Sequence, residues 1–312
     1  MEKRKVTVIG AGHVGSHVAL SLAVEHVADE VVLVDRDPKK AEAQALDIFD
    51  AMSFENHAVY VHDGDYADVE DSDVVVIAIG MPRKPGQDRT GMLDDSIVMC
   101  DELIDSLSPY KIPGVLISIT NPCDVIADYL RKGLHLDKNK AFGTGTMLDT
   151  TRLKRVLSQM TGVSRSSIQG YAMGEHGETS MIPYSVIRIG GRDYHEFGLS
   201  DEEVLKEVRA GGWIIIKGKL STEFGIGRAA TELAEAVIRD EKKILPASVL
   251  LDGEYGQKDV QIGVPCMIGK DGIEQIIELS MSSDEKAAFD YSCDVVRGNI
   301  ATAMKKSQRG VK

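Results

Sequence analysis

The sequence predicts an α/β protein, with a doubly wound parallel sheet in its first half and a mixed α+β domain in its second half. In the first half, short runs rich in valine and isoleucine alternate with segments of helical periodicity, which is the pattern of parallel β-α-β units. In the second half, strand-like runs are separated by turn residues, which is typical of antiparallel hairpins. With 312 residues and a hydrophobic content of 43%, the chain can bury a large core.

The N-terminal segment predicts a strand, a glycine turn and a helix. Val6–Ile9 is an apolar run, Gly10-Ala11-Gly12-His13-Val14-Gly15 follows at once, and helical periodicity continues through Leu22. A second strand at Val31–Val34 ends in Asp35. The next elements expected are a helix at Ala41–Ala51, strands at Val59–Val61 and Asp73–Ile79, a helix at Asp94–Leu107, a strand at Val115–Ile119 and a helix that starts at Asn121-Pro122.

We expect residues 1–140 to form the first domain and residues 141–312 the second, with no flexible linker and therefore a shared cleft between them. The elements expected in the second domain are a helix near Thr150–Met160, strands near Ser167–Ala172 and Ser185–Arg188, two long helices separated near Leu220, a meander of short strands between Ala247 and Ile277 with turns at Asp252-Gly253 and Lys270-Asp271-Gly272, and a last helix that starts at Ser282 with a capping box to Glu285.

The glycine turn and Asp35 predict a dinucleotide-binding site on a Rossmann-type sheet. Gly10, Gly12 and Gly15 allow the backbone to approach a pyrophosphate at a helix N-terminus, and an aspartate at the end of the second strand accepts hydrogen bonds from a ribose diol. Because Asp35 would repel a 2′-phosphate, NAD is expected rather than NADP, although the neighbouring Arg36 could accommodate that phosphate.

Asp149, Arg152 and His176 are the candidate catalytic residues. A histidine that exchanges a proton with a substrate oxygen works best when a carboxylate holds its other ring nitrogen and a guanidinium clamps an acidic substrate. Taken singly, His176 could be a loop histidine and the other two an ordinary helical ion pair. Together with a dinucleotide site, they favour chemistry on a small carboxylic acid.

A charged loop is predicted at Gly80–Gly91, directly after the strand at Asp73–Ile79. It contains two prolines, three glycines, Arg83 and Arg89, and it leaves the carboxyl end of a parallel strand, where ligands bind in such sheets. Its length suits a lid that closes cations over a bound anion. The alternative is a solvated surface loop without a role.

Composition excludes several other classes of function. The formal net charge of -13 argues against a nucleic-acid partner. The longest apolar run, Val74–Ile79, is too short to cross a membrane, and the N-terminus lacks a signal-peptide pattern, so a cytoplasmic protein is expected. The four cysteines are widely spaced and predict buried free thiols rather than a metal site or a disulfide framework.

Taken in order, these motifs resemble the L-lactate and malate dehydrogenase family, in particular its lactate-dehydrogenase-type branch. The segments that carry the resemblance are Gly10-x-Gly12-x-x-Gly15, Asp35, Arg83–Arg89, Asn121-Pro122-Cys123-Asp124, Gly143–Arg152, Gly174-Glu175-His176-Gly177 and Leu251–Gly256. The resemblance implies reversible hydride transfer between NAD and a small 2-keto or L-2-hydroxy acid, in a homo-oligomer that is a dimer or a tetramer. The single tryptophan, Trp213, lies in a long apolar helix and could belong to the core or to such an interface.

The resemblance also implies a role for each residue of the site. His176 would give a proton to the ketone oxygen and take it back in the reverse direction, Asp149 would hold the imidazole, and Arg152 would clamp the C1 carboxylate. The other implied roles are polarisation of the carbonyl by Arg89 on the lid, a neutral hydrogen bond near the same oxygen and the nicotinamide ribose from Asn121, an apolar face for the nicotinamide from Ile226 and a wall for the substrate side chain from Thr222.

The motifs disagree on the substrate and on regulation. In the family, arginine at the position of Arg83 goes with oxaloacetate and malate, whereas Thr222 and the segments around Asp149 and His176 are of the lactate type. We therefore expect a lactate dehydrogenase with substantial oxaloacetate activity, and a dedicated malate dehydrogenase is the alternative. Where many bacterial relatives bind fructose 1,6-bisphosphate through arginine and histidine, this chain has Lys154 and Gln169, so strong activation is not expected.

Two other classes of function are compatible with a dinucleotide-binding sheet. An NAD-dependent, metal-assisted glycosidase would need a metal site, and the sequence has no cluster with ligand spacing. A catalytically inactive NAD-binding regulator would be expected to have lost Asp149, Arg152 or His176, and all three are present. A dehydrogenase without a metal is therefore the preferred interpretation.

Overall fold

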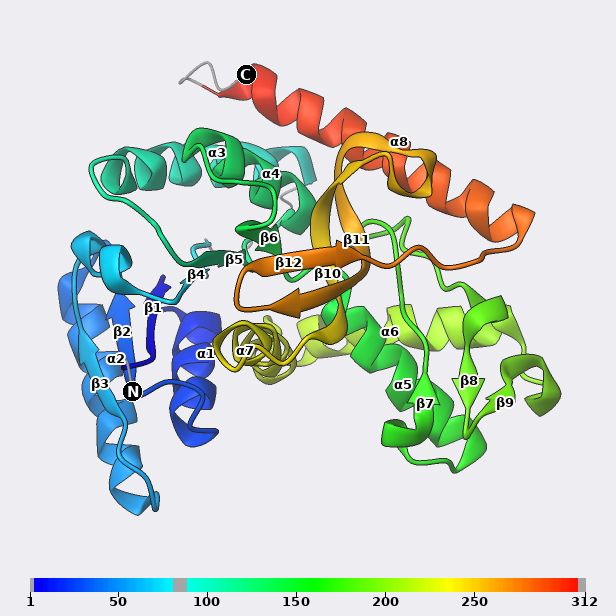
Figure 1. Ribbon diagram of the computed structural model, residues 1–312, viewed down its shortest axis with the longest axis horizontal. Helices are drawn as coiled ribbons and strands as arrows, with labels where there is room; N and C mark the ends of the chain where they lie inside the picture. Colours follow the sequence, from blue (N-terminus) through cyan, green and yellow to red (C-terminus); the bar gives the residue numbers. More distant parts are fainter. Residues whose placement is uncertain (1–2, 81–88, 308–312) are drawn as a thin grey trace.

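A large mixed sheet forms the centre of the computed structural model, which describes residues 3–80 and 89–307 (Figure 1). The strands of this sheet, from one edge to the other, are β3 (Tyr60–Asp63), β2 (Glu30–Val34), β1 (Lys5–Ile9), β4 (Val74–Ile77), β5 (Val115–Ser118), β6 (Ala141–Gly143), β10 (Lys243–Asp252), β11 (Lys258–Gly269) and β12 (Gly272–Ile276). The strands from β3 to β6 pair in parallel, and β10, β11 and β12 continue the sheet antiparallel. The strand order changes direction between β1 and β4, and ligands bind at such a switch point in doubly wound sheets.

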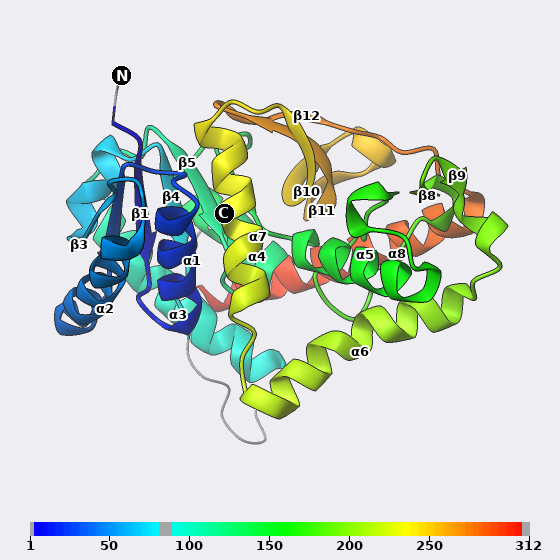
Figure 2. The ribbon, with the colours of Figure 1, turned by 90° about the horizontal axis from the view of Figure 1, so that it is seen from below.

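Helices cover both faces of this sheet. The helices of the described chain are α1 (His13–Val24), α2 (Pro38–Ala51), α3 (Arg89–Leu107), α4 (Cys123–Gly133), α5 (Met147–Thr161), α6 (Asp201–Lys219), α7 (Phe224–Ile238) and α8 (Ser283–Lys306). Figure 1 shows α3, α4 and α8 above the sheet and α1 and α7 below it, and Figure 2 shows α1 and α7 side by side. The predicted fold class, a Rossmann-type parallel sheet followed by an α+β part, is confirmed.

The first half contains the predicted elements in the predicted order, with one correction that concerns the site. Helix α3 begins at Arg89, five positions before the predicted start at Asp94, so Arg89 is not part of a loop as predicted. Proline and glycine in Gly80–Gly91 favoured a loop over the whole segment, but the helix forms across Gly91 because its later residues pack into the core. Arg83 lies outside the described residues. The parallel strands also continue to Gly143, just beyond the proposed domain boundary at 140.

The second half differs more from the prediction. The meander is present with its predicted turns, but β10 and β11 are long strands rather than short ones, and Pro246 pairs opposite Pro265 inside the hairpin. Proline within a run argues against a strand, yet both prolines lie inside paired strands here. The strand predicted at Ser167–Ala172 pairs only at β7 (Ile168–Gln169). A small second sheet completes this region, with strands β7, β8 (Arg188–Ile189) and β9 (Arg192–Asp193).

Several local predictions concern single side chains. The capping box at the start of α8 is present, with Ser282 Oγ accepting from Glu285 N and Glu285 Oε2 accepting from Ser282 N. Trp213 lies on α6 with 50% of its surface exposed, so it does not belong to the core of a single chain. The four cysteines are buried free thiols, as predicted.

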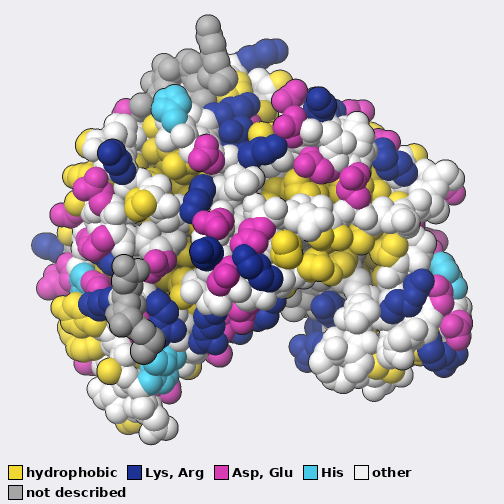
Figure 3. Space-filling model, viewed as in Figure 1, with side chains coloured by type: hydrophobic (Ala, Val, Ile, Leu, Met, Phe, Trp, Pro, Cys, Tyr) yellow, Lys and Arg dark blue, Asp and Glu magenta, His cyan; other side chains and the backbone are white. Residues whose placement is uncertain are grey.

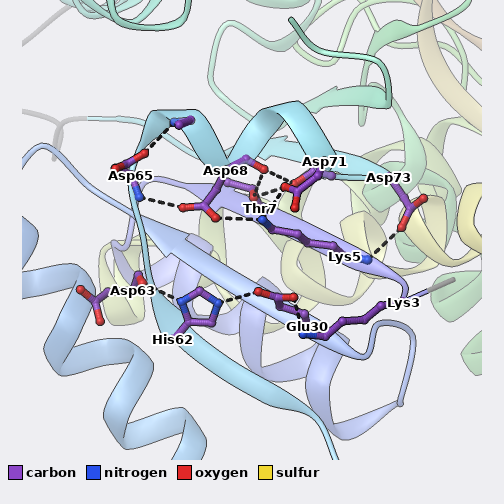
Figure 4. Close-up of polar contacts among 12 residues, drawn as sticks. Lys3, Lys5, Thr7, Glu30, His62, Asp63, Asp65, Asp68, Asp71 and Asp73 are labelled. Carbon is purple, nitrogen blue, oxygen red and sulfur yellow. Dashed lines mark hydrogen bonds and ion pairs between the residues drawn. The ribbon is translucent and has the colours of Figure 1, made fainter. Parts of the chain in front are cut away.

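A network of buried charge joins the amino ends of β1 and β4 (Figure 4). This Lys5 network consists of Lys5, Asp68, Asp71 and Asp73. Lys5 is only 6% exposed, and its Nζ donates to Asp68 Oδ1 at 2.8 Å and to Asp71 Oδ1 at 2.5 Å. The backbone N–H of Lys5 donates to Asp73 Oδ2 at 2.8 Å. On the molecular face shown in Figure 3, acidic and basic side chains are interspersed and neither kind forms a continuous stripe.

Candidate active site

The glycine turn after β1 is packed so closely that Gly10 and Gly15 leave no room for side chains of their own. Gly10 has a φ of +108°, and a Cβ there would lie 2.5 Å from the carbonyl oxygen of Ala78. A Cβ on Gly15 would lie 1.8 Å from the carbonyl oxygen of Gly10. Gly12 is the N-cap of α1 and offers no side-chain cap, so the first N–H groups of the helix face an open turn. This shape fits the pyrophosphate of a dinucleotide.

Asp35 lies at the same turn, directly after β2. Its Oδ2 accepts from the backbone N–H of Ala11 at 2.9 Å, and its Oδ1 accepts from the N–H of Asp37 at 3.1 Å. Lys40 was not predicted here, yet its Nζ is 3.4 Å from Asp35 Oδ2 and close to Gly12. The carboxylate is therefore positioned where a ribose diol beside the glycine turn would reach it, and the residues present fit NAD.

The catalytic candidates come together from helix α5, which carries Asp149 and Arg152, and from the segment between β7 and β8, which carries His176. In this His176 network, which consists of His176, Asp149 and Arg152, Nδ1 of His176 is 2.6 Å from Asp149 Oδ2. Arg152 Nη1 donates to Asp149 Oδ1 at 3.0 Å from one helical turn further along α5. All three side chains are partly exposed, with 24% of His176 and 14% of each of the other two accessible. The structure therefore places one carboxylate between an imidazole and a guanidinium.

The protonation of this network follows from its contacts. The charge of Asp149, together with its hydrogen bond, raises the pKa of His176 although burial opposes the shift. Burial by itself would raise the pKa of Asp149, but His176 and Arg152 lower it overall, so Asp149 is an anion at neutral pH. The imidazolium form of His176 is thereby favoured, which suits a group that must donate a proton.

Asp124 is a buried carboxylate behind His176 to which the sequence alone assigned no role. It lies in the first turn of α4, its Oδ2 accepts from the backbone N–H of His176 at 2.9 Å, and its Oδ1 accepts from Ser248 Oγ at 2.5 Å. Burial raises its pKa to about 6. Asp124 belongs to the motif Asn121-Pro122-Cys123-Asp124, which is recognisable in the sequence. Its hydrogen-bond partners, however, are far away in the chain, and only the fold brings them together.

Of the remaining predicted site residues, the structure describes Asn121, Thr222 and Ile226 with their side chains. Asn121 directly follows β5 and is exposed, and its backbone oxygen accepts from Ser96 Oγ at 2.8 Å. Thr222 is half-buried in the turn between α6 and α7, and Ile226 is 9% exposed on the first turn of α7. The side chain of Arg89 is outside the described residues, as is the whole of Arg83. Because β1, β2, β5 and β6 are parallel, the segments that follow them share the carboxyl edge of the sheet.

An ion-pair cluster that the sequence did not reveal joins the glycine turn to the start of α7. Nδ1 of His13 is 3.0 Å from Glu223 Oε1, and Lys219 Nζ donates to Glu223 Oε2 at 2.8 Å. Thr222 is the neighbour of Glu223 in the chain. The contact therefore holds the cofactor half of the site next to the residues predicted to line the substrate half.

The structure also describes Lys154 and Gln169, the two residues at the positions considered for regulation. Lys154 is half-buried on α5, where burial lowers its pKa, and Gln169 is exposed on β7. Among residues 3–80 and 89–307, no group of three or more histidine, cysteine, aspartate or glutamate side chains is arranged to hold a metal ion. In the same residues, none of the helices combines the length and the apolar character needed to cross a membrane.

Two family models together match nearly the whole chain. The model of the lactate/malate dehydrogenase NAD binding domain matches residues 4–143, and that of the lactate/malate dehydrogenase alpha/beta C-terminal domain matches residues 146–307. The L-lactate dehydrogenase of Fusobacterium nucleatum is 37% identical over 309 residues, covering 96% of this chain and 97% of the relative.

Two solved structures show the same fold with different substrate names. A lactate dehydrogenase from Cryptosporidium parvum, complexed with lactic acid and NAD, matches with a TM-score of 0.91 at 30% identity and covers 97% of this chain and 98% of its own. A malate dehydrogenase from Salinibacter ruber matches with a TM-score of 0.87 at 31% identity and covers 98% of each chain. Overall similarity therefore does not separate the two substrates.

Proposed function

The chain belongs to the lactate/malate dehydrogenase family and is an NAD-dependent oxidoreductase, and we propose that it interconverts pyruvate and L-lactate and also reduces oxaloacetate. The observation that carries this proposal is the His176 network at the carboxyl edge of a sheet whose glycine turn fits a dinucleotide. Gly10, Gly12, Gly15 and Asp35 would hold NAD. When bound, NADH supplies the hydride that reduces C2 of the keto acid, and NAD accepts it in the reverse direction.

His176 is the proposed general acid and base. With Nδ1 held by Asp149, its other ring nitrogen is the one directed to a ligand, and the raised pKa keeps a proton available for the ketone oxygen. In the oxidation of lactate the neutral imidazole takes the proton from the hydroxyl group. Asp149 stabilises the imidazolium in both directions without itself becoming protonated.

Arg152 is the proposed clamp for the C1 carboxylate. Within the described residues its only hydrogen bond is the one from Nη1 to Asp149, and its guanidinium lies about 3.5 Å from the position that a Cβ on Gly212 of α6 would take. The rest of the planar fork is thus available for a ligand carboxylate, to which it can donate two parallel hydrogen bonds. Asn121 and Arg89 are the proposed further donors near the reacting oxygen.

Arg83 supports activity on oxaloacetate. A guanidinium closed over C3 of the substrate would meet a carboxylate in oxaloacetate but only a methyl group in pyruvate. An unpartnered buried charge costs about 3 to 5 kcal/mol, and a long arginine side chain that turns toward water reduces this penalty. The similarity to a malate dehydrogenase of known structure makes a dedicated malate dehydrogenase the second candidate.

The test is the oxidation of NADH, followed at 340 nm, with pyruvate, oxaloacetate and a branched keto acid side by side. In Arg83→Gln we expect kcat/KM for oxaloacetate relative to pyruvate to fall by about 10²-fold, because the substitution removes the charge that pairs with the second carboxylate. Lys84→Gln is the matched control, since it removes a neighbouring positive charge. An unchanged ratio in Arg83→Gln would show that Arg83 does not select the substrate.

A further inference from the structure

The loop that carries His176 is tied to the C-terminal helix by one buried hydroxyl group. Ser292 lies on α8 and is completely buried, and its Oγ accepts from the backbone N–H of Glu175 at 2.8 Å. The same Oγ is 2.9 Å from Thr179 Oγ1. Thr179 in turn donates to Glu175 Oε2 from its Oγ1 at 2.7 Å and from its N–H at 3.1 Å. Ser292 therefore joins Glu175 and Thr179, the two ends of a short segment that contains His176.

The backbone of this loop is shaped to make the contact. Gly174 has a φ of +88°, and a Cβ there would lie 2.7 Å from Ser292 Oγ. A Cβ on Gly177 would lie 2.6 Å from the carboxyl carbon of Glu175, so the Glu175 side chain folds back beneath the loop. Gly174 therefore permits both its left-handed backbone and the close approach of Ser292, and Gly177 leaves room for the side chain of Glu175.

Helix α8 is a rigid support for this contact, because it is fixed near both ends. Close to its start, Glu285 accepts from the N–H and the Oγ of Ser185 at 2.9 and 2.6 Å. At its other end, Lys306 pairs with Asp94 of α3, and Ser307 bonds to Tyr129 of α4. Figure 1 shows α8 crossing over β11 toward α3 and α4. A site residue is held accurately when its supporting elements are themselves fixed.

Two consecutive backbone groups of the loop are held by two different helices. The N–H of Glu175 is bound by Ser292 of α8, and the N–H of His176 is bound by Asp124 of α4. With the backbone fixed in this way, the imidazole meets Asp149 of α5 at 2.6 Å. A small displacement of the loop would lengthen that contact, and misplacement by about 1 Å is enough to lower a rate by a large factor.

We propose that Ser292, with Thr179, is a positioning residue for His176 that holds the loop in the geometry needed for proton transfer. The proposal rests on the dehydrogenase function above, in which His176 transfers the proton. Ser292 does not touch the substrate or the cofactor. Its loss removes the acceptor of a buried N–H, and the loop moves to satisfy that group elsewhere.

The experiment compares variants that remove or keep the hydroxyl groups. Ser292→Ala and Thr179→Val remove them at nearly constant volume, and Thr179→Ser keeps the hydroxyl as a rescue. Ser72→Ala is the matched control, because Ser72 is also buried and its Oγ contacts Thr7 Oγ1 at 2.8 Å and the backbone oxygen of Asp68 at 2.7 Å, far from the site. For each variant, kcat and KM for pyruvate, the Kd of NAD and the Tm are measured.

A second readout follows His176 without turnover. The pKa of His176 is measured by NMR on histidine-labelled protein, with His176→Asn used to assign its signal. Among the residues whose side chains the structure describes, the charged groups that face His176 are Asp149 and Arg152 of α5 and Asp124 of α4. Because Asp149 is the main cause of the raised pKa, a loosened contact to it lowers the pKa of His176 toward its ordinary value.

The expected result is a fall in kcat of about tenfold and a lowered pKa of His176 in Ser292→Ala and Thr179→Val, with the Kd of NAD unchanged and Thr179→Ser close to wild type. Ser72→Ala lowers the Tm without either effect. The proposal is overturned if Ser292→Ala matches Ser72→Ala in kcat and in the pKa of His176. If Ser292→Ala does not fold, the Thr179 pair decides. If the wild type reduces no keto acid, the proposed function fails while the pKa of His176 still tests the positioning role.

Discussion

The molecule contains two networks of charged side chains, and they differ in which groups their hydrogen-bond donors meet. In the Lys5 network, one buried ammonium group donates to Asp68 and Asp71 (Figure 4). In the His176 network, His176 and Arg152 both bond to the single carboxylate of Asp149, and among residues 3–80 and 89–307 the other ring nitrogen and most of the guanidinium have no further hydrogen bond. The comparison teaches that burial of charge alone does not mark an active site. Hydrogen-bond donors that have no partner within the described protein are a stronger sign of an active site.

The two networks also differ in the sign of their charge. The Lys5 network sets one cation against three carboxylates, whereas the His176 network, once its imidazole is protonated, sets two cations against one carboxylate. The pKa of Lys5 is raised overall, because its contacts to Asp68 and Asp71 outweigh the lowering effect of burial. An excess of positive charge at a partly open site suits an anionic substrate, and an excess of negative charge at the opposite edge of the sheet does not.

The largest expected effect is that of Asp149→Asn, which keeps the size of the side chain and removes its charge. We expect kcat for pyruvate reduction to fall by about 10³-fold, because the imidazole loses both its orientation and the stabilisation of its cation. The Kd of NADH should stay unchanged, since the glycine turn is untouched. Asp193→Asn, which breaks a surface ion pair with Arg188, is the control and should leave kcat as it is.

The pH dependence of the same variant gives an independent check. Reduction needs the protonated imidazole, so the activity of the wild type falls as the pH rises through the raised pKa of His176. In Asp149→Asn that pKa moves down, and the fall in the rate of reduction begins at a lower pH. If the rate of reduction declined at the same pH in both proteins, His176 would not be the group that titrates. The functional contrast between the two networks would then be contradicted.

A smaller effect is expected from Lys5→Met, and it concerns stability rather than rate. The substitution removes two charge-assisted hydrogen bonds, and because Asp71 is largely exposed the loss is discounted to about 2 kcal/mol in the free energy of unfolding. The value of kcat should not change, because Lys5 is at the amino end of β1. Lys3→Met removes the exposed pair to Glu30 and should cost less than about 0.5 kcal/mol in urea unfolding. A fall in kcat for Lys5→Met would contradict the separation of the two networks.

Much of the fold could be predicted because its signals are local. Alternating apolar runs and helical segments gave the order of elements from β1 to β6, and the glycine turn with Asp35 predicted where they would hold a dinucleotide. The start of α3 and the full length of β10 could not be predicted, because tertiary packing there overrides the local preference of glycine in α3 and of Pro246 in the hairpin.

The reacting groups of the candidate site could be predicted from the sequence, but the residues that hold the His176 loop in position could not. The types and order of Asp149, Arg152 and His176 pointed to acid–base chemistry, and the structure brings them together. Asp124 and Ser292, which hold the backbone of the His176 loop, come from helices far away in the sequence and have no local signature. A contact between distant segments is a property of the fold, so residue types alone do not reveal it.

Apart from the control substitutions, the smallest effect is expected from Asp124→Asn. Asp124 contacts the His176 loop, but like the Lys5 network it is expected to affect the free energy of unfolding. Asp124 is buried and accepts two hydrogen bonds, and burial raises its pKa to about 6 although the nearby His176 lowers it. Because the folded state binds this proton more tightly than the unfolded state, Asp124 destabilises the fold increasingly as the pH rises from its ordinary pKa of 3.8 to about 6. Asparagine does not titrate, and its amide can serve both partners. The free energy of unfolding of the variant relative to wild type should therefore rise by about 1 kcal/mol between pH 5 and pH 8. A difference that falls over this range would show that Asp124 stabilises the protein as an anion, as the partners of Lys5 do.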